Sequence, residues 1–454
     1  MDGFRRKMLD NFLTWKESHI NALITDDITI TYAELYKLVC GKVNQISEKN
    51  VIMALCNVNG IPFIVDLMAI LISGNVPLII PPYLSDDDII KVMSRCNAIK
   101  YINSDISGLV KNEDEECLKN IILENDVAII MFSSGTTSDG KMIPISYESL
   151  FYRITYTNKY FVRREACSEL FFMPLSSAAG LQHQLFPCLT KKCTIVLYEG
   201  VFNPRKIVNL ISKYHISYLS MVPSLFKSIY QYCIKRNENL EDIDKIFICG
   251  EKIDADFLQK AFEYFKGIDL VQAYGMSEML PVSMHLYKSK EEIVENSVGE
   301  VLEEVKVKII DKDIYGVGEI CISGRNMINR YWSSTKRFQW IQTGDIGYID
   351  ENRVLYILGR KKNMVIINGN NIYTEEIERN VELYPGIVEA KAYGIRDKLR
   401  GEAIVLQIKL DDGYTIDVKE LRKYLCTKLS VHSVPFKIQI VNEIEKNYNY
   451  KKKR

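Results

Sequence analysis

Residues 129–146, IIMFSSGTTSDGKMIPIS, join the end of an apolar run to a loop of small polar residues. The run at 127–132 predicts a buried strand. It is followed by Ser133, Ser134, Gly135, Thr136, Thr137, Ser138, Asp139, Gly140 and Lys141. Small residues let the backbone approach a ligand, and hydroxyl and N–H groups donate to phosphate oxygens. Because the spacing of a Walker A loop is absent, the stretch alone predicts either another kind of phosphate loop or a polar turn between two strands.

Composition narrows the class of protein. The chain has 454 residues, enough for two or three domains, and its 58 basic and 58 acidic residues cancel. This balance gives no basic field that would bind nucleic acid or an anionic membrane. The 11 cysteines form no C-x-x-C pair, and the five histidines lack metal-ligand spacing. We therefore expect reduced thiols, a cytoplasmic location and no structural zinc.

The apolar segments do not predict a targeting or membrane segment. The N-terminal sequence MDGFRRKMLDNFLTW has no long apolar core, so it does not indicate a signal peptide. The most apolar stretch, 61–80, is interrupted by Asp66, Gly74, Asn75 and Pro77. It is too broken for a membrane span.

The first third of the chain alternates between strand-like and helix-like segments. We expect a short strand that leads into a helix within 28–39, strands near 52–56, 76–80, 98–102 and 127–132, and helices near 62–72 and 85–96, while the acidic, amphipathic segment 111–123 is expected to cross the surface to the strand at 127–132. Strands that alternate with helices of this length predict right-handed βαβ units and a mostly parallel sheet. The sequence therefore predicts an α/β fold.

Four later segments decide between the two interpretations of the 133–141 loop. They are IFICGEKI at 246–253, VQAYGMSE at 271–278, QTGDIGYID at 342–350 and YILGRKKNMVIINGNNIYTEEIE at 356–378. Together with SSGTT-x-x-x-K, and in this order, they resemble the acyl-adenylate-forming (AMP-binding) superfamily. This superfamily includes acyl- and aryl-CoA synthetases, nonribosomal adenylation domains and luciferases. The resemblance extends from about residue 31 to the end of the chain.

The resemblance implies a domain organisation. It predicts a large N-terminal AMP-binding domain, residues 1–359, built of two βαβ subdomains and a β-rich subdomain. A small mobile α+β C-terminal lid domain, residues 360–454, follows, with a hinge near Lys362. A loop around Gly369 would face the thiol of the second substrate.

The resemblance also implies a nucleotide site. Phosphate oxygens would be bound by Ser133, Ser134, Gly135, Thr136, Thr137 and Lys141. The adenine and ribose would contact Gly250, Glu251, Lys252, Gln272, Ala273, Tyr274, Gly275, Met276, Asp345 and Arg360. Within this set, Tyr274 would stack on adenine and Asp345 would accept both ribose hydroxyls. Ser277 would contact a phosphate or carboxylate oxygen, and Glu278 would hold Mg²⁺.

The C-terminal tail departs from the family pattern. The family ends in a loop with a Gly-Lys pair whose lysine drives adenylation, whereas this chain ends in EIEKNYNYKKKR. Aligning the final arginines places Lys451 on that lysine, with Lys446 as the alternative. A solvated basic tail is the competing interpretation. Ser138 and Thr374 also replace a family glycine and proline.

The segment LFFMPLSSAAGLQHQLFPCL, 170–189, resembles the family's acyl pocket. Ser177, Gly180 and Leu181 would line it, and Ser177 stands where many members carry a histidine or an aromatic residue. A lone histidine on a helix is more often structural, and we interpret His183 in that way. The segment offers no aspartate for a substrate ammonium, which would be costly to bury unpaired. We therefore expect a carboxylic acid with an uncharged aliphatic or aromatic tail.

The function implied is ATP- and Mg²⁺-dependent activation of a small carboxylic acid through acyl-AMP, with transfer to a thiol. The first hypothesis is an acyl- or aryl-CoA ligase. A stand-alone ligase that loads the phosphopantetheine of a separate carrier protein is the second. The degenerate tail leaves a third, a non-catalytic adenylate-binding homologue. No Walker A or Walker B pattern supports a P-loop kinase or ATPase.

Overall fold

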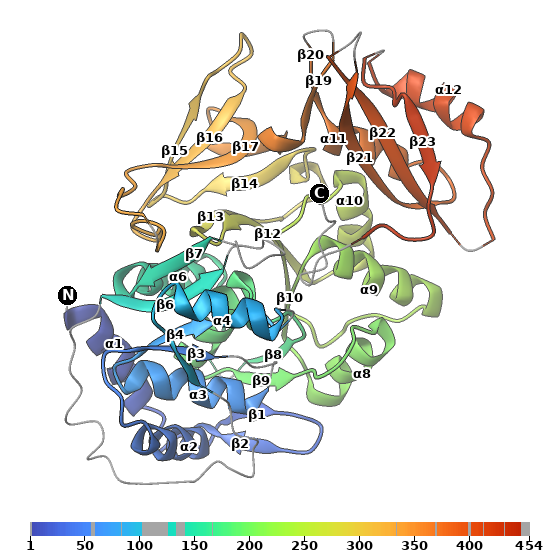
Figure 1. Ribbon diagram of the computed structural model, residues 1–454. Helices are drawn as coiled ribbons and strands as arrows, with labels where there is room; N and C mark the ends of the chain where they lie inside the picture. Colours follow the sequence, from blue (N-terminus) through green and yellow to red (C-terminus); the bar gives the residue numbers. More distant parts are fainter. Residues whose placement is uncertain are drawn as a thin grey trace.

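The computed structural model describes residues 2–55, 60–82, 84–101, 126–132, 141–165, 167–332, 334–367, 370–397, 401–411, 413–430 and 432–445. Within them, the strands form three sheets of 13, five and five strands. The 13-stranded sheet and one of the five-stranded sheets belong to the larger part of the molecule. The other five-stranded sheet forms a separate C-terminal layer (Figure 1). This is the α/β architecture that the sequence predicts.

The N-terminal five-stranded sheet is built from βαβ units. Its strand order is β5-β3-β4-β6-β7, parallel except for the last pair. The strands are β3 (Ile52–Leu55), β4 (Val76–Ile79), β5 (Ile99–Tyr101), β6 (Val127–Phe132) and β7 (Met142–Ser146), and the helices between them are α3 (Ile61–Ile72) and α4 (Asp86–Ser94). The strands and helices predicted for this sheet are confirmed, and the amphipathic segment 111–123 lies outside the described residues.

The 13-stranded sheet joins a parallel half to an antiparallel half. The parallel half contains β1 (Asn21–Ile24), β8 (Ser168–Phe171), β9 (Thr194–Leu197), β10 (Tyr218–Met221), β11 (Lys245–Cys249) and β12 (Asp269–Met276), with β2 (Thr29–Thr31) antiparallel at its edge. The antiparallel half contains β13 (Met279–Leu286), β14 (Ser297–Val301), β15 (Lys306–Ile310), β16 (Gly318–Ser323), β17 (Ile341–Ile349) and β18 (Val354–Arg360). The predicted second βαβ subdomain and β-rich subdomain thus share one continuous sheet, because β12 pairs with both β11 and β13.

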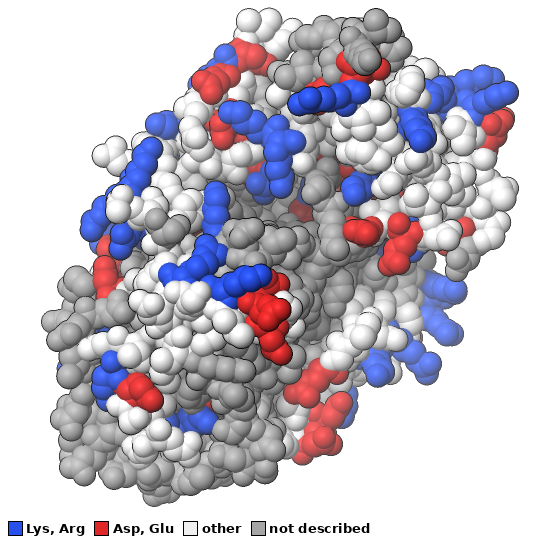
Figure 2. Space-filling model, in the orientation of Figure 1, with Lys and Arg blue, Asp and Glu red and all other residues white. Residues whose placement is uncertain are grey.

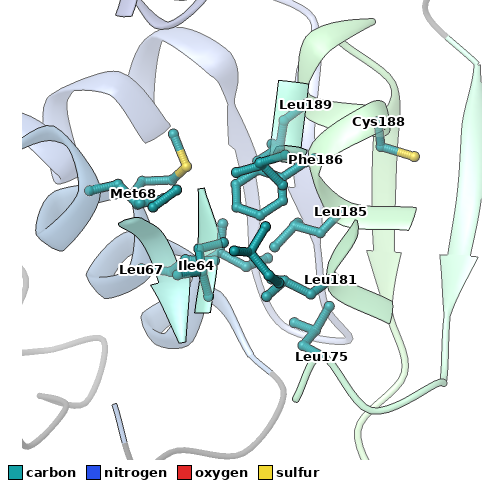
Figure 3. Packing of buried hydrophobic residues seen from close by; sticks show 14 of the residues in the cluster. Ile64, Leu67, Met68, Leu175, Leu181, Leu185, Phe186, Cys188 and Leu189 are labelled. Carbon is teal, nitrogen blue, oxygen red and sulfur yellow. The ribbon is translucent and has the colours of Figure 1, made fainter. Parts of the chain in front are cut away.

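Helices cover the sheets and enclose the core. They are α1 (Asp2–Leu13), α2 (Tyr32–Gln45), α6 (Tyr147–Tyr160), α7 (Phe186–Thr190), α8 (Pro204–Tyr214), α9 (Pro223–Arg236), α10 (Ala255–Tyr264), the π-helix η2 (Ala179–Leu185) and the short 3-10 helix η3 (Lys290–Glu292). Thr31 and Glu34 form a capping box that begins α2, which satisfies two otherwise unpaired N–H groups. Figure 3 shows α3 packed against η2 and α7 through aliphatic side chains.

The C-terminal sheet has the order β20-β19-β22-β21, with β23 parallel to β22. Its elements are β19 (Met364–Ile367), β20 (Asn370–Tyr373), α11 (Thr374–Glu382), β21 (Ile387–Asp397), β22 (Gly401–Leu410), α12 (Val418–Lys428) and β23 (Lys437–Ile440). It has its own hydrophobic core. The 3-10 helix η4 (Lys361–Asn363) connects β18 to β19 and contains Lys362. The predicted domain boundary at 359/360 therefore falls beside the change of sheet, while the hinge motion stays a prediction.

Charges of both signs are interspersed on the face shown in Figure 2. This distribution agrees with the zero formal net charge of the chain. Among the helices in the described part of the chain, none combines the length and the apolar character needed to cross a bilayer.

Candidate active site

The site is organised around the two-residue turn Ser277–Glu278. This turn connects β12 to β13, at the point where the large sheet changes from parallel to antiparallel, and Met276 pairs with Met279 across it. Gly275 precedes the turn, and a Cβ there would lie 2.9 Å from the Cβ of Leu280. Close packing therefore favours glycine at 275. The turn presents both predicted catalytic side chains at one end of the sheet.

A buried arginine from α6 holds this turn. The Arg153 guanidinium, 0% exposed, donates to the carbonyl oxygens of Ser277 at 3.0 Å and Glu278 at 2.8 Å. It also donates to the carbonyl of Asn326, to Ser149 Oγ and to Gln182 Oε1. Burial lowers the pKa of Arg153 to about 9, although the Glu278 charge acts to raise it. The group is therefore charged at neutral pH and is compensated by five acceptors.

Glu278 lies beside the end of the predicted phosphate loop. Its carboxylate is mostly buried, 7% exposed, and Oε1 accepts a hydrogen bond of 2.9 Å from Tyr331 Oη. Lys141 Nζ lies 4.5 Å from the centroid of the Tyr331 ring and 3.4 Å from its hydroxyl. Burial, and then the Glu278 charge, raise the pKa of Tyr331, so the phenol stays protonated. Lys141, Tyr331 and Glu278 thus form one connected line.

A second cluster brings three predicted nucleotide residues together. Asp345 and Arg360 are cross-strand partners on β17 and β18, and Arg360 Nε lies 2.7 Å from Asp345 Oδ1. Tyr274 Oη, from β12, donates to Asp345 Oδ2 at 2.5 Å. Burial, and then the Asp345 charge, raise the pKa of Tyr274 well above its usual value. The Asp345 carboxylate, 3% exposed, is thereby fixed by an arginine and a neutral phenol.

The loop after β11 carries three more predicted adenine residues. Gly250 has a φ of +88° and lines the cavity described below, so a side chain there would be strained. Glu251 Oε2 accepts from the backbone N–H of Ser224. Lys252 Nζ lies 2.5 Å from Asn296 Oδ1, and burial lowers its pKa.

A cavity opens beside the turn. It encloses about 1040 Å³, part of it open to solvent, and it is bordered by residues from both N-terminal sheets. The lining comprises Pro81, Phe132, Met173, Ser176, Ser177, Ala178, Ala179, His183, Val222, Phe247, Cys249, Gly250, Ala273, Tyr274, Gly275, Met276, Ser277, Leu280 and Pro281. No Asp, Glu, Lys or Arg occurs among these described lining residues. The cavity is therefore suited to an uncharged group.

The structure separates the three predicted acyl-pocket residues. Ser177 lines the cavity, and its Oγ accepts from the Gly180 N–H at 3.0 Å. Gly180 does not belong to the lining, and a Cβ there would lie 2.3 Å from the Pro174 carbonyl oxygen. Leu181 is fully buried in the core that contains α3, where Figure 3 shows it. Leu181 therefore packs the core rather than lining the cavity, which corrects its predicted place.

Gln272 also lies away from the cavity. It is mostly buried in β12, donates to the Ser297 carbonyl oxygen and accepts from the Tyr287 hydroxyl. Its neighbours Ala273, Tyr274, Gly275 and Met276 do line the cavity. The predicted adenine segment is thus divided between the sheet interior and the cavity wall.

Several predicted site residues lie outside the described residues. They are Ser133, Ser134, Gly135, Thr136, Thr137, Gly369, Lys446 and Lys451. The strands that flank the predicted phosphate loop are described, and Phe132 pairs with Met142. The ends of this loop are therefore fixed next to Lys141 and the Ser277–Glu278 turn.

Sequence reasoning missed Arg153 and Tyr331. The signal for Arg153 was available: the buried residues of α6 include Ser149, Leu150, Arg153, Tyr156 and Thr157, which share one helix face. A charge on that face requires buried partners. Tyr331 carried no comparable signal, because its contacts with Lys141 and Glu278 span distant segments.

Two family models match the chain. A model described as "AMP-binding enzyme" matches residues 15–332, and one described as "AMP-binding enzyme C-terminal domain" matches residues 376–451. The first match alone covers more than half of the chain. The chain therefore belongs to the AMP-binding enzyme family.

Individual relatives of known name are distant. The mitochondrial medium-chain acyl-CoA ligase ACSF2 of Pongo abelii is 27% identical over 329 residues, 68% of this chain and 54% of ACSF2. Feruloyl-CoA synthase of Amycolatopsis sp is 25% identical over 334 residues, 70% of this chain and 67% of the synthase. The matched region thus spans about half of ACSF2 and about two thirds of feruloyl-CoA synthase.

Solved structures extend the likeness over nearly the whole chain. The o-succinylbenzoate CoA synthetase (MenE) of Bacillus subtilis, in complex with its acyl-adenylate intermediate, gives a TM-score of 0.83 at 23% identity. The superposition covers 97% of this chain and 96% of MenE. MenE has also been solved with ATP and a magnesium ion. At this identity the likeness establishes the fold, with its smaller C-terminal domain.

Proposed function

We propose that the protein activates a carboxylic acid with ATP, forms an acyl-AMP with release of pyrophosphate, and transfers the acyl group to the thiol of CoA. The observation that carries the proposal is the convergence of two clusters on one cavity. Lys141, Tyr331 and Glu278 form the first, and Tyr274, Asp345 and Arg360 form the second. The cavity is lined by Tyr274 of the second cluster and by Ser277, which precedes Glu278 of the first cluster.

The chemistry proposed needs no general base. A carboxylate is ionised at pH 7 and attacks the α-phosphorus directly, so the protein has to position two anions and offset their charge. In this proposal Lys141 and Arg360 supply cations, and Asp345 accepts the ribose hydroxyls. The site thus combines positive charge with a carboxylate for the sugar.

Glu278 fits a divalent cation. Its Oε1 is bonded to Tyr331, whereas Oε2 has no protein partner among the described residues. A hard cation such as Mg²⁺ prefers oxygen ligands and binds through one or two carboxylates together with phosphates. When bound, Mg²⁺ would offset the negative charge of the phosphates.

The cavity supports an acid with an uncharged tail. Because no charged side chain occurs in its described lining, a substrate ammonium would lack a partner there. This argues against α-amino acids, as the sequence of 170–189 also does. The relatives ACSF2 and feruloyl-CoA synthase carry names of a fatty and an aryl acid ligase, so both tail types belong in a substrate panel.

Support for CoA as the thiol acceptor comes from the relatives rather than from the site. Each relative and the MenE structure named above is a CoA ligase or synthetase by name, which favours CoA over a carrier protein. We place the hinge for the second step at Lys362, in the 3-10 helix between the two cores. The adenylation lysine is proposed to be Lys451.

The test is acid-dependent ATP–pyrophosphate exchange over fatty, aryl and amino acids, followed by thioester formation with CoA or with a phosphopantetheinyl carrier protein. We expect exchange with one acid class and CoA-dependent product. Glu278→Gln should lower kcat roughly 100-fold, the loss typical of one charge-stabilising group. Lys451→Ala and Lys446→Ala, measured in parallel, identify the lysine. ATP binding without exchange for any acid would contradict the proposal and favour the non-catalytic homologue.

A further inference from the structure

The π-helix η2 (Ala179–Leu185) sends its side chains in several directions. Leu181 and Leu185 pack into the core that contains α3, and Gln182 reaches Arg153. Gln184 Nε2 donates to Glu169 Oε1 at 2.9 Å. Ala179 and His183 are the described residues of this turn that line the cavity. π-helical turns are frequent at functional sites, and this one connects the core, the catalytic turn and the cavity.

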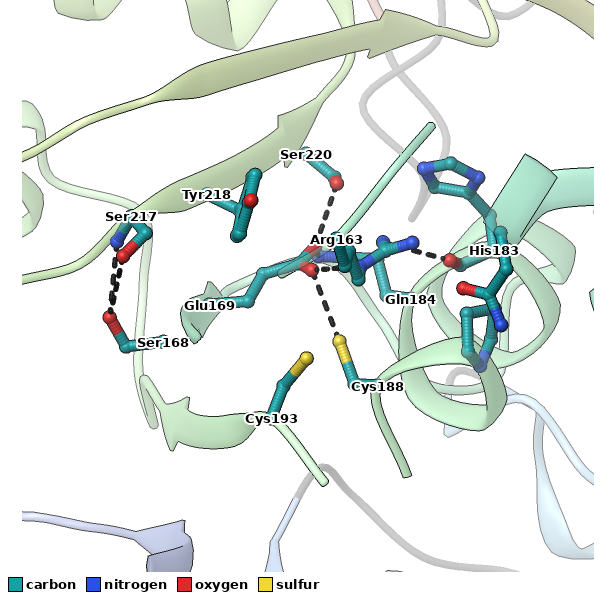
Figure 4. A network of polar contacts seen from close by, with 12 residues as sticks. Arg163, Ser168, Glu169, His183, Gln184, Cys188, Cys193, Ser217, Tyr218 and Ser220 are labelled. Carbon is teal, nitrogen blue, oxygen red and sulfur yellow. Dashed lines mark hydrogen bonds and ion pairs between the residues drawn. The ribbon is translucent and has the colours of Figure 1, made fainter. Parts of the chain in front are cut away.

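The His183 ring is fixed by aromatic and backbone contacts. It stacks on Phe247, with ring centroids 3.5 Å apart and an interplanar angle of 18°, and it also contacts Phe161. Its backbone carbonyl accepts from Arg163 Nη2 at 3.1 Å. Figure 4 shows the imidazole turned away from the Arg163–Glu169 network, which reaches only this carbonyl. The ring orientation therefore does not depend on a hydrogen bond of its own.

The Nε2 atom of His183 is buried and has no hydrogen-bond partner among the described residues. His183 as a whole is 2% exposed. Most buried polar atoms in proteins are paired, so an unpaired one in a cavity wall is a place where a ligand can supply the partner. The neighbouring wall residues Phe247, Ala178 and Ala179 offer no side-chain hydrogen-bonding group.

The charge state of the ring restricts the kind of partner. Burial, and then the nearby Arg163 guanidinium, lower the pKa of His183 well below its usual value. The imidazole is therefore neutral at pH 7 and offers one donor and one acceptor nitrogen. A neutral ring carries no charge to balance a carboxylate or an ammonium, so it favours a hydroxyl or a carbonyl group as its partner.

The geometry points to His183 as a specificity residue that hydrogen-bonds a neutral hydroxyl or carbonyl group on the tail of the carboxylic acid. This rests on the proposed function, because it takes the cavity to be the binding site of the acid. It revises the interpretation of His183 as structural. It also narrows the substrate class from an uncharged tail to a neutral tail with a hydrogen-bonding group.

The test compares acids that differ only in a tail hydroxyl: alkanoates of four to ten carbons against their ω-hydroxy forms, and 3-phenylpropanoate against 3-(4-hydroxyphenyl)propanoate. Binding is measured by calorimetry with AMP present, and pyrophosphate exchange is measured separately. The variants are His183→Phe, which keeps the stacking on Phe247, and His183→Gln, which keeps a hydrogen-bonding group. The exposed His19→Phe is the matched control.

We expect the wild-type protein and His19→Phe to bind one hydroxylated acid about tenfold or more tightly than its partner. The preference should disappear in His183→Phe and be partly kept in His183→Gln. A preference that survives in His183→Phe, or a wild-type preference for the plain acid in every pair, overturns the inference.

The two measurements separate the two proposals. Exchange without any hydroxyl preference retains the ligase function and overturns the role of His183. Discrimination in binding without exchange retains the role of His183 and overturns the ligase function. Absence of acid binding overturns both.

Discussion

Replacing Arg153 with methionine tests whether a buried cation holds the Ser277–Glu278 turn. Methionine has a similar length and fills part of the same volume, but it donates no hydrogen bond. The substitution removes the donor for Ser277 O, Asn326 O and Gln182 Oε1. Glu278 O keeps one partner, because the N–H of Ile328 donates to it at 2.9 Å.

The magnitude follows from these three orphaned acceptors. A buried acceptor without a partner costs about 1–3 kcal/mol, and costs within one network do not add fully. Methionine also removes the desolvation cost of the charge itself, which offsets part of the loss. We therefore expect a net destabilisation of about 2–4 kcal/mol. Arg153→Lys keeps the charge but loses the planar fork of donors, so it should lose less stability.

The assay has two readouts. Thermal unfolding of Arg153→Met, Arg153→Lys and the exposed control Arg6→Met measures stability, and Arg6 should behave like the wild type because its ion pair with Asp10 is exposed. Pyrophosphate exchange below the melting temperature measures kcat and the KM for ATP. Misplacement of the turn should lower kcat more than it raises KM, because the turn acts on the reacting groups.

Two results would refute this reasoning. If Arg153→Met has the same melting temperature as the wild-type protein, the five hydrogen bonds do not stabilise the turn. If Arg153→Lys is more stable than Arg153→Met but has the same kcat, stability and activity depend on Arg153 for different reasons. Recovery of both by lysine in proportion supports a positioning role.

Three further predictions concern groups near the cavity. Burial and Arg163 lower the pKa of His183 in the folded protein. Below about pH 6.5, His183 is therefore protonated in the unfolded chain while it stays neutral in the folded protein, which favours unfolding. Wild-type protein should therefore lose about 1 kcal/mol more stability than His183→Phe between pH 7 and pH 5.5. Glu169→Leu should cost about 3–5 kcal/mol by leaving Arg163 buried and unpaired, and the double variant with Arg163→Met should recover much of it in a double-mutant cycle. Tyr331→Phe should raise the KM for MgATP about two- to tenfold by removing the hydrogen bond to Glu278.

Each of these predictions has a contradicting outcome. Parallel stability-against-pH curves for wild type and His183→Phe would show that His183 protonates normally in the fold. An additive double variant would show that Arg163 and Glu169 do not interact. An unchanged KM for MgATP in Tyr331→Phe would show that the phenol does not orient the Glu278 carboxylate. Burial alone would raise the pKa of Glu169, but the Arg163 charge and the hydrogen bonds from Arg163, Gln184 and Cys188 lower it, so additivity is not expected.

The parts of the site that the sequence predicted lie where a strand ends. Tyr274 lies near the end of the buried strand β12, Ser277 and Glu278 follow that strand, and Asp345 and Arg360 belong to adjacent antiparallel strands. Their order along the chain carried the prediction, because the segments that contain them resemble the family's motifs in that order. The ion pair between Asp345 and Arg360 then follows from cross-strand register.

The parts that could not be predicted depend on contacts between distant segments. Arg153 acts on backbone carbonyls 124 and 125 positions away, and a backbone carbonyl has no residue type that a sequence pattern could reveal. Leu181 was predicted in the acyl pocket, whereas η2 places some of its side chains, Leu181 among them, in the core and others in the cavity wall. Only the packing against α3 decides which side chain faces which environment.

Under the two proposals, the helical turn η2 brings acid recognition next to phosphate chemistry. Gln182 and His183 are consecutive, and the first contacts the arginine that holds the Ser277–Glu278 turn while the second lines the cavity. Leu181 and Leu185 anchor the turn in a close-packed core, which resists small displacements. A group bound at His183 is therefore held by the same rigid element that positions the catalytic turn. Under the two proposals, such sharing would fix the acid carboxylate relative to Ser277 without a contact between the tail and the phosphates, and tail recognition and reaction geometry would depend on one helical turn.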